Sequence, residues 1–376
     1  MIKLIYLGGE DISARLDMAV RIKSLGFNIE IIGTQNTSAF KGKMIPYKKY
    51  SLNRELNFIN DLKSIFEIRT ILKGQRGFAI VHAFDTKPAM YLPFAVWGLK
   101  NIKIVKTITG MGRIFTEQSF KNTILKTVYK LIQKAVKSKI DKIIFQNNDD
   151  CNYYVKNNLI NIKNAVVIKS SGIDLARFTA KVKDSQLSLL RKALNLHNKK
   201  TFILVSRLVK QKGILNYLQA AKICKTKGYQ YNFLLVGQLD TDNSITLGEV
   251  ESYNEYVNYL GKREDIQELL LLSDIFVLPT YYREGVPRVL LEASAIGLPL
   301  ITTNMPGCKD VLINGFNGIV TNVKDSTDLS KKMIALAEDE ELLNKLSINA
   351  KEKVKEFDLK IVVEQYNHVY RSVLMK

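Results

Sequence analysis

Short apolar runs rich in β-branched residues alternate with helix-patterned segments along nearly the whole chain, and this alternation constrains the fold most. Intervening segments such as 12–25 and 57–73 end at Gly26 and Gly74, residues that favour helix C-termini. Strands separated by helices are typical of parallel sheets covered on both faces. The sequence therefore predicts an α/β protein with two Rossmann-like, doubly wound lobes. The predicted strands are 2–7, 28–32, 79–82, 104–108, 142–146 and 165–169, then 202–206, 232–236, 257–260, 275–280 and 300–303.

The length of 376 residues is more than one ordinary core holds and suits two α/β domains. The strand–helix alternation restarts after the stretch 170–200. We therefore predict an N-terminal lobe over 1–170, a C-terminal lobe over 171–355 and a final helix over 356–376. That helix carries an apolar stripe that we expect to pack back across a cleft onto the N-terminal lobe. The stripe consists of Ile361, Val362, Tyr366, Val369, Tyr370 and Val373.

Positive charge is concentrated in the first half of the chain. The net charge is +20, and residues 1–170 hold 28 basic and 12 acidic side chains against 28 and 24 in the remainder. Residues 100–142 carry eleven basic side chains but only Glu117 and Asp141 as acids. An excess of this size predicts an anionic partner for the N-terminal lobe: nucleic acid, lipid or a nucleotide.

The segment 119–139 has the pattern of a basic amphipathic helix. Five lysines recur at helical spacing, Lys121, Lys126, Lys130, Lys134 and Lys137, interleaved with Leu125, Val128, Leu131, Ile132, Ala135 and Val136. Such a helix lies in the interface of an anionic membrane, or it is a surface helix whose apolar stripe belongs to the core. A nucleic-acid-binding protein is a third reading, but no nucleic-acid module or aromatic platform is recognised.

Neither a membrane span nor an export signal is indicated. The most apolar stretch, 88–99, is about 12 residues long, whereas a span needs roughly 20. The start, MIKLIYLGG, is too short for a secretory apolar region and reads as a strand. Cys151, Cys224 and Cys308 form no CxxC pair and predict neither a zinc site nor a disulfide. We expect a cytoplasmic protein associated peripherally with the inner face of the plasma membrane.

Two cations, Arg207 and Lys212, follow the predicted strand 202–206 where the chain opens through Gly213 into a helix. A helix N-terminus offers free N–H groups and a positive dipole, and two cations can add charge-assisted bonds to a diphosphate. The alternative is a solvated basic turn. Further along, Asp240 and Asp242 form a DxD pair, for which an ordinary Asp-rich turn is favoured over a metal site.

Two glutamates, Glu284 and Glu292, flank the start of the helix that follows strand 275–280. Eight helical residues span about 12 Å, which suits the two hydroxyl-bearing ends of one nucleotide sugar. We expect Glu284 to bind the hexose and Glu292 the ribose, with the helix start at 287–289 facing the phosphates. The alternative is that Glu284 is a helix-capping acid and Glu292 an exposed helix residue.

The motifs SRLVKQKG, YLGKRED, LPTYYREGVPRVLLEA and NGFNGIV resemble the retaining family 4 glycosyltransferases of GT-B fold. The resemblance implies that Arg207, Lys212 and Glu284 serve catalysis, the two cations on the donor diphosphate and the glutamate on the donor sugar. It places Glu292 on the ribose and Gly261 and Arg263 beside the base. The same helix start supplies the remaining donor contacts: Gly285, Val286, Pro287 and Val289.

The resemblance also bears on cofactors and rival functions. It implies no cofactor and no metal, because the UDP-sugar is a substrate. Two enzyme alternatives on the same fold, a nucleotide-sugar epimerase and a phosphorylase, need no lipid acceptor, and a basic nucleic-acid-binding protein remains the alternative from another class.

In the N-terminal half, VHAFDTKPAMY, VKTITGMGRIF, FQNNDD and SSGIDLARF resemble members that extend polyprenyl-diphosphate-linked saccharides for bacterial O-antigen, capsule or other glycans. This implies a hexose or N-acetylhexosamine donor and an acceptor site in the first lobe. Many relatives carry a His before Gly after the fourth strand, where this chain has Thr109 and Gly110, two residues that we still expect to contact the acceptor. His82 is either a substitute or a hydrogen-bonded strand-end residue. Close to the first strand we expect acceptor contacts from Gly8, Gly9 and Arg15.

Overall fold

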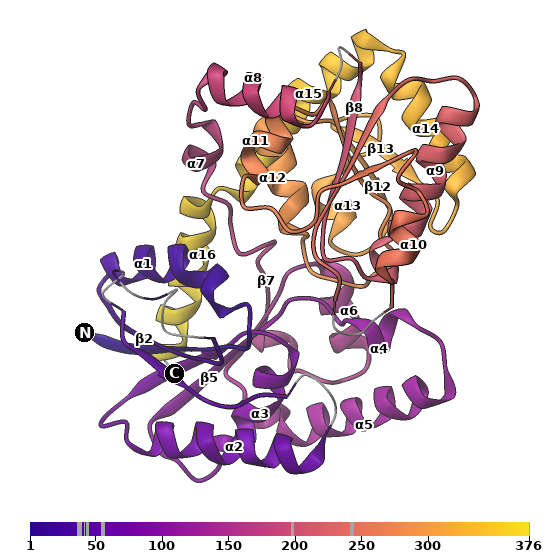
Figure 1. The fold of residues 1–376 in the computed structure, drawn as a ribbon. Coiled ribbons are helices and arrows are strands. Elements are labelled where there is room, and N and C mark those ends of the chain that lie inside the picture. The colour runs from indigo at the N-terminus through magenta and orange to yellow at the C-terminus, as the bar shows by residue number, and fades with distance from the viewer. Residues whose placement is uncertain are drawn as a thin grey trace. The chain divides into compact units, whose positions relative to one another are not determined.

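The computed structural model describes residues 1–35, 40, 42, 45–53, 57–196, 199–240 and 244–375. The chain forms two compact units, Met1–Gly172 together with Leu359–Lys376, and Ile173–Asp358. The chain passes from the first unit to the second between Gly172 and Ile173, whereas the sequence predicts the boundary after residue 170. The chain returns to the first unit at Leu359, whereas the sequence predicts that the final helix begins at residue 356. Each unit is an α/β structure around one parallel sheet (Figure 1).

The first unit contains a seven-stranded parallel sheet in the order β3-β2-β1-β4-β5-β6-β7. Six strands lie where the sequence predicts them, and the seventh, β3, is a three-residue edge strand, Tyr47–Lys49. The strand order reverses at β1, because β2 and β3 lie on one side of it and β4 to β7 on the other. The remaining strands are β1 (Ile2–Leu7), β2 (Phe27–Gly33), β4 (Ala79–Ala83), β5 (Ile102–Ile108), β6 (Lys142–Phe145) and β7 (Ala165–Val167).

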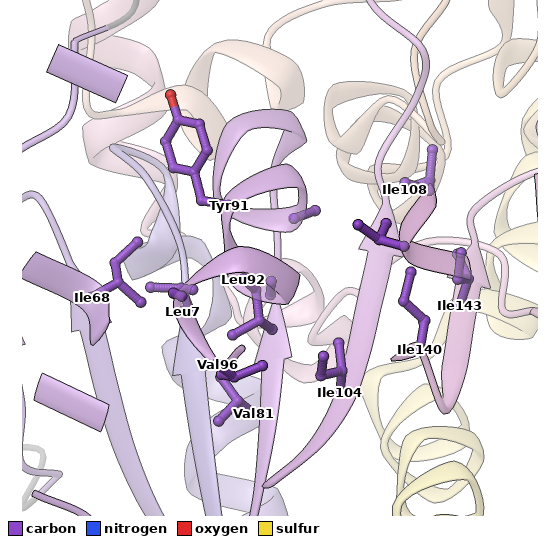
Figure 2. Close-up of a cluster of buried hydrophobic side chains, with 14 of the residues drawn as sticks. Leu7, Ile68, Val81, Tyr91, Leu92, Val96, Ile104, Ile108, Ile140 and Ile143 are labelled. Carbon is purple, nitrogen blue, oxygen red and sulfur yellow. The ribbon is translucent and has the colours of Figure 1, made fainter. Parts of the chain in front are cut away.

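Helices cover both faces of this sheet. One core joins the strands to α2 (Phe58–Lys73), α3 (Thr86–Ala95), α5 (Phe120–Val136) and α6 (Asn148–Lys156). Figure 2 shows part of it, with Val81 and Ile104 of the strands beneath Leu92 of α3 and Val96, which directly follows that helix. Short elements complete this unit: η1 (Ile12–Arg15), α4 (Arg113–Thr116), η3 (Lys137–Lys139) and η4 (Ile162–Asn164).

The opposite face is covered by α1 (Leu16–Ser24) and by α16 (Leu359–Leu374), the last helix of the chain. α16 buries five of the six residues of the predicted stripe, and Tyr370 Oη donates to Tyr6 Oη of β1 at 3.2 Å. Ile361 is the exception, since it is 47% exposed. It lies off the helical stripe, which Leu359 and Val363 complete instead. The C-terminal residues thus belong to the core of the first unit.

The second unit repeats the doubly wound pattern with a six-stranded parallel sheet, β10-β9-β8-β11-β12-β13. Its order reverses between β8 and β11. The predicted α/β class with two Rossmann-like lobes is therefore confirmed. The strands are β8 (Thr201–Val205), β9 (Asn232–Val236), β10 (Asn258–Tyr259), β11 (Ile275–Leu278), β12 (Leu300–Thr303) and β13 (Gly318–Thr321).

Two further cores, one on each face, hold the helices of the second unit. These are α7 (Leu175–Thr179), α8 (Asp184–Ala193), α9 (Ile214–Thr226), α10 (Leu247–Glu251), α11 (Ile266–Leu271), α12 (Arg288–Ile296), α13 (Cys308–Val311), α14 (Ser326–Ala337) and α15 (Glu340–Val354), with η5 (Lys210–Lys212) and η6 (Lys355–Phe357). Across the described part of the chain, no helix combines the length and apolar character needed to cross a membrane.

Candidate active site

In the second unit, the neighbouring strands β8 and β11 are the point where the strand order reverses. Their carboxyl ends lead into the loops 206–213 and 279–287. In open α/β sheets, ligands bind in the crevice at this reversal point. Arg207, Lys212 and Glu284 all lie in these two loops, so the topology brings together residues that are far apart in the sequence.

Lys212 and Glu284 form a direct ion pair. Lys212 Nζ donates to both carboxylate oxygens of Glu284, at 2.7 Å each. Both side chains are largely buried, with exposed fractions of 11% and 17%. The N-terminal cap of α12 is Pro287, so Glu284 is not the capping acid that the alternative interpretation required. A solvated basic turn likewise does not describe Lys212.

The turn that carries Lys212 depends on Gly213. This glycine has a left-handed backbone, with φ 76°, between η5 and α9. A Cβ atom there would lie 2.1 Å from the carbonyl oxygen of Pro279, at the end of β11. The close approach of the two loops therefore requires glycine, and it sets Lys212 beside Glu284.

Arg207 is held from a different direction. Its guanidinium pairs with the carboxylate of Asp240, which follows β9, while the Arg207 side chain remains 51% exposed. Asp240 is the first acid of the DxD pair, and Asp242 lies outside the described residues. Within the described part of the chain, no cluster of three or more His, Cys, Asp or Glu side chains could hold a metal ion.

The start of α12 presents a buried backbone to the same crevice. Gly285, Val286 and Pro287 are buried, and Val289 is partly exposed in the first turn. The loop before α13 packs tightly here, since a Cβ atom on Gly307 would lie 1.9 Å from the carbonyl oxygen of Gly285. A close-packed helix start with free N–H groups is suited to an anion.

Glu292 lies two turns further along α12. Its Oε1 accepts a hydrogen bond from Arg288 Nε at 3.0 Å, and its side chain is 16% exposed. Burial raises the pKa of the Glu292 carboxyl, while the charges of Arg288 and Arg177 act in the opposite direction. Glu292 is therefore a largely buried carboxylate rather than an exposed helix residue.

Gly261 and Arg263 follow β10 on the far side of β9. Gly261 has φ 64°, and its carbonyl oxygen accepts from the N–H of Gly237 at 2.8 Å. Arg263 forms a two-bond pair with Asp265, at 2.8 and 2.5 Å. The side-chain bond with Asp265 raises the pKa of Arg263. This pairing holds the Arg263 side chain beside the start of α11.

The first unit has its own reversal point, between β1 and β4. Gly8 and Gly9 directly follow β1, and the Gly9 N–H donates to Asp85 Oδ2, just after β4, at 2.9 Å. A Cβ atom on Gly8 would lie 2.5 Å from Ile12. Arg15, at the end of η1, donates to Ser171 Oγ and lies over the ring of Phe84, 5.3 Å from its centroid.

Two other predicted acceptor residues, Thr109 and Gly110, come directly after β5, one strand beyond β4. Both are partly exposed, and Gly110 has φ 118°. All five predicted acceptor residues therefore follow the carboxyl ends of β1 or β5, which belong to the same edge of the parallel sheet.

His82 is a hydrogen-bonded core residue. It is fully buried, with Nδ1 2.7 Å from Tyr370 Oη and Nε2 2.7 Å from Thr107 Oγ1. Burial, together with the charge of Arg15, lowers the pKa of His82 well below its usual value. With both ring nitrogens occupied inside the protein, His82 is not a substitute for an acceptor-side histidine.

The sequence did not predict two residues that bind predicted site residues, Asp240 and Asp85. Asp240 was considered only for a metal, yet it holds Arg207. Asp85 was not singled out at all, although it lies shortly after a predicted strand, at the edge where open α/β sheets bind ligands. Burial raises the pKa of the Asp85 carboxyl, opposed by the Arg15 charge and the Gly9 N–H.

Comparison with known proteins shows the family of this chain. The family model described as glycosyl transferases group 1 matches residues 188–353. The chain is 30% identical over 328 residues to the N,N'-diacetylbacillosaminyl-diphospho-undecaprenol alpha-1,3-N-acetylgalactosaminyltransferase of Campylobacter jejuni, covering 86% of this chain and 85% of that one. It is 28% identical to the UDP-Gal:alpha-D-GlcNAc-diphosphoundecaprenol alpha-1,3-galactosyltransferase of Escherichia coli, covering 81% and 77%.

The fold has a close match among solved structures. Anabaena Alr3699/HepE in complex with UDP-glucose superposes with a TM-score of 0.81 at 18% identity, covering 99% of this chain and all of that one. Two doubly wound units with a basic and acidic site at the strand reversal define a glycosyltransferase of GT-B fold. This chain belongs to the group 1 glycosyltransferases. Neither relative named above is an epimerase, a phosphorylase or a nucleic-acid-binding protein.

Proposed function

We propose that this glycosyltransferase moves a hexose or N-acetylhexosamine from a UDP-sugar to a polyprenyl-diphosphate-linked saccharide, with retention of anomeric configuration. The observation that carries the proposal is the buried Lys212–Glu284 pair at the reversal point of the second unit. The two enzymes reported above are named for undecaprenol-diphosphate acceptors, and one of them for UDP-galactose. A surface polysaccharide such as O-antigen or capsule is the expected destination.

The donor diphosphate would bind where positive charge faces the crevice. Arg207, Lys212 and the start of α12 supply cations and N–H groups, and Glu284 accepts from a sugar hydroxyl. Lys212 and Arg207 are paired with Glu284 and Asp240 in the protein itself. The diphosphate therefore enters a site whose cations are already positioned, and its charge competes with those carboxylates.

Transfer then needs no protein nucleophile. The acceptor hydroxyl oxygen bonds to the anomeric carbon while the bond from that carbon to the diphosphate oxygen breaks. The hydroxyl proton passes to the departing diphosphate on the same face, which gives retention, the outcome that the resemblance to family 4 leads us to expect. Lys212 and Arg207 stabilise the charge that develops on the leaving group as the sugar becomes oxocarbenium-like.

An anionic membrane surface is the proposed location of the acceptor, and α5 supports it. Its outward side carries four exposed apolar residues at helical spacing, Phe120, Ile124, Val128 and Leu131, with exposed fractions of 83%, 49%, 45% and 62%. The opposite side packs in the core through Tyr129 and Val136. The helix is thus apolar on two sides and lysine-rich between them, which suits insertion at a lipid interface.

A second helix on the same face of the sheet adds to this surface. α2 exposes Phe58, Ile59, Leu62 and Phe66. Trp97 links it to the end of α5, because Arg69 of α2 donates to the Trp97 carbonyl oxygen at 2.6 Å and Lys139 Nζ lies 4.1 Å from the Trp97 ring centroid. We propose a peripheral attachment at the inner face of the plasma membrane through this helix layer (Figure 1).

The linkage formed in the product tests the proposal. The purified protein would be incubated with a UDP-α-sugar and a polyprenyl-diphosphate-linked N-acetylhexosamine, and the new linkage determined by nuclear magnetic resonance. Retaining transfer gives an α-linked disaccharide. A β-linked product would contradict retention, and free sugar or an epimerised donor with no new linkage would contradict transfer.

A further inference from the structure

Asp85 stands at the reversal point of the first sheet, between β1 and β4, yet it has no assigned role. Parallel sheets open a crevice at the carboxyl ends of the strands where the order reverses, because the adjoining connections leave on opposite faces. Here α1 lies on one face and α3 on the other. Gly9 follows β1 and Asp85 follows β4 at this end of the sheet, and these two residues are hydrogen-bonded to each other.

The carboxylate of Asp85 is fixed through one oxygen and open at the other. Oδ2 accepts from the Gly9 N–H at 2.9 Å. Among the residues that the structure describes, Oδ1 has no hydrogen-bond partner, and the side chain is partly exposed. Although Asp85 occupies the cap position of α3, its side chain makes no capping bond. Helix capping therefore does not account for this carboxylate.

The backbone of Asp85 is strained. Its φ of 65° and ψ of 158° fall in a region that is almost restricted to glycine. Such conformations cost of order 1–3 kcal/mol and are retained at sites where a side chain must be presented in a fixed direction. A glycine here would remove the strain but also the carboxylate, so the strain points to a use for the carboxylate itself.

The surroundings select the kind of group that the open oxygen can accept. A carboxylate repels phosphate and accepts hydrogen bonds from hydroxyl groups, for which sugar diols are well suited. The Arg15 guanidinium lies close enough to oppose the rise in the pKa of Asp85, which favours the ionised form as a hydrogen-bond acceptor. Asp11 is the other charged group that acts on Asp85, and it acts in the opposite direction.

We propose that Asp85 binds a hydroxyl group of the acceptor saccharide through Oδ1 and thereby orients the acceptor for transfer. The inference rests on the proposed function. It adds a side chain to the acceptor site that the sequence predicts, which consists of Gly8, Gly9, Arg15, Thr109 and Gly110. It also assigns recognition of the sugar, rather than of the diphosphate, to the strand ends of β1 and β4.

The test compares two substitutions with a matched control. Asp85→Asn keeps an oxygen for the Gly9 N–H but loses the charge, and Asp85→Gly removes the side chain in a residue that tolerates this backbone. The control is Asp274→Asn, because Asp274 Oδ2 likewise accepts from a backbone N–H, that of Thr201, at 2.7 Å. This bond lies at the amino ends of β8 and β11 in the second unit, away from the proposed acceptor site. Each variant is assayed for acceptor KM, kcat, UDP affinity and thermal unfolding.

We expect both Asp85 variants to lose about tenfold or more in kcat/KM for the acceptor with UDP affinity unchanged, while the control behaves like the wild type. Asp85→Asn, which keeps the bond to the Gly9 N–H, should also keep the wild-type unfolding temperature. Undiminished acceptor use by either Asp85 variant would overturn the inference, as would an equal loss of UDP affinity. If the wild type itself transfers no sugar to any lipid-linked acceptor, the proposed function fails and this inference with it. Wild-type transfer with fully active variants contradicts the role of Asp85 alone.

Discussion

At the scale of single residues, the proposed donor site contains one largely buried cation, Lys212. Lys212 carries a positive charge that the proposed mechanism directs at the leaving diphosphate. We expect Lys212→Ala to lower kcat by about 10²-fold or more, the usual effect of removing one such donor. Lys353→Ala is the matched control, because Lys353 is equally buried and also binds both oxygens of a glutamate, Glu356. Near-wild-type turnover of Lys212→Ala would refute the assignment.

His82 makes the first unit sensitive to acid. Its pKa in the folded state lies below the value of about 6.5 expected in the unfolded chain, so at lower pH the unfolded state binds the extra proton. Stability should therefore fall as the pH drops below about 6.5, by up to about 1.4 kcal/mol per pH unit from this group.

Urea unfolding followed by Trp97 fluorescence measures this effect, since Trp97 is the only tryptophan and belongs to the first unit. The comparison is between the wild type and His82→Gln from pH 7 to pH 5. The difference in unfolding free energy between the two should change across that range. Parallel pH dependences would show that His82 does not titrate on unfolding.

Residue partners were the part that the sequence could not supply. Lys212 and Glu284 are 72 positions apart, and nothing in their spacing indicates that they bind each other. The same holds for His82 and Tyr370, which are 288 positions apart. The residue types and their place after predicted strands were readable from the pattern, whereas contacts of this range are set by the strand order.

At the scale of elements, the turn between β8 and α9 holds Lys212 in the proposed donor site. Gly213→Ala would place a Cβ against the Pro279 carbonyl oxygen in a left-handed backbone. Gly228→Ala is the matched control, with φ 91° and no atom within 4 Å of the new Cβ. We expect the control to lose about 1 kcal/mol of stability from the backbone term, and Gly213→Ala to lose more and to lose transferase activity too. Equal losses in thermal unfolding would contradict the steric argument.

The outward side of α5 carries the proposed membrane contact. Leu131→Ser and Phe120→Ser remove exposed apolar groups without touching the core side of the helix. We expect both to weaken sedimentation with vesicles that contain anionic lipid, and high salt to weaken it further. Ile348→Ser, at a 70% exposed position on α15 of the second unit, should have no effect. Wild-type binding by the α5 variants would contradict a role for this surface.

Most elements could be predicted because alternating strand and helix periodicities are strong local signals. β1, β9 and β12 have the predicted bounds, the other predicted strands differ by one or two residues at an end, and β13 was not predicted. β3 was missed because three residues, Tyr47–Lys49, with no buried side chain give no pattern to detect. The sequence of α5 did not decide between a membrane-interface helix and a surface helix packed on the core. Which of its apolar residues are buried depends on the elements that pack against it.

At the scale of the whole molecule, the chain builds a doubly wound sheet twice, and we propose that each copy serves a different half of the reaction. The proposed donor contacts belong to Ile173–Asp358, and the proposed acceptor contacts belong to Met1–Gly172. The excess positive charge lies in the acceptor unit, which also exposes the apolar sides of α2 and α5. A lipid-linked acceptor at an anionic membrane and a nucleotide sugar in solution would explain why the first unit is more basic and more apolar at its surface than the second.

The most direct test of this account is mass spectrometry of a polyprenyl-diphosphate-linked N-acetylhexosamine incubated with the purified protein and a panel of UDP- and GDP-sugars. The account predicts that the acceptor gains the mass of one hexose or N-acetylhexosamine from a UDP-sugar, with release of an equal amount of UDP. An acceptor of unchanged mass, together with hydrolysis or epimerisation of a nucleotide sugar, would contradict it.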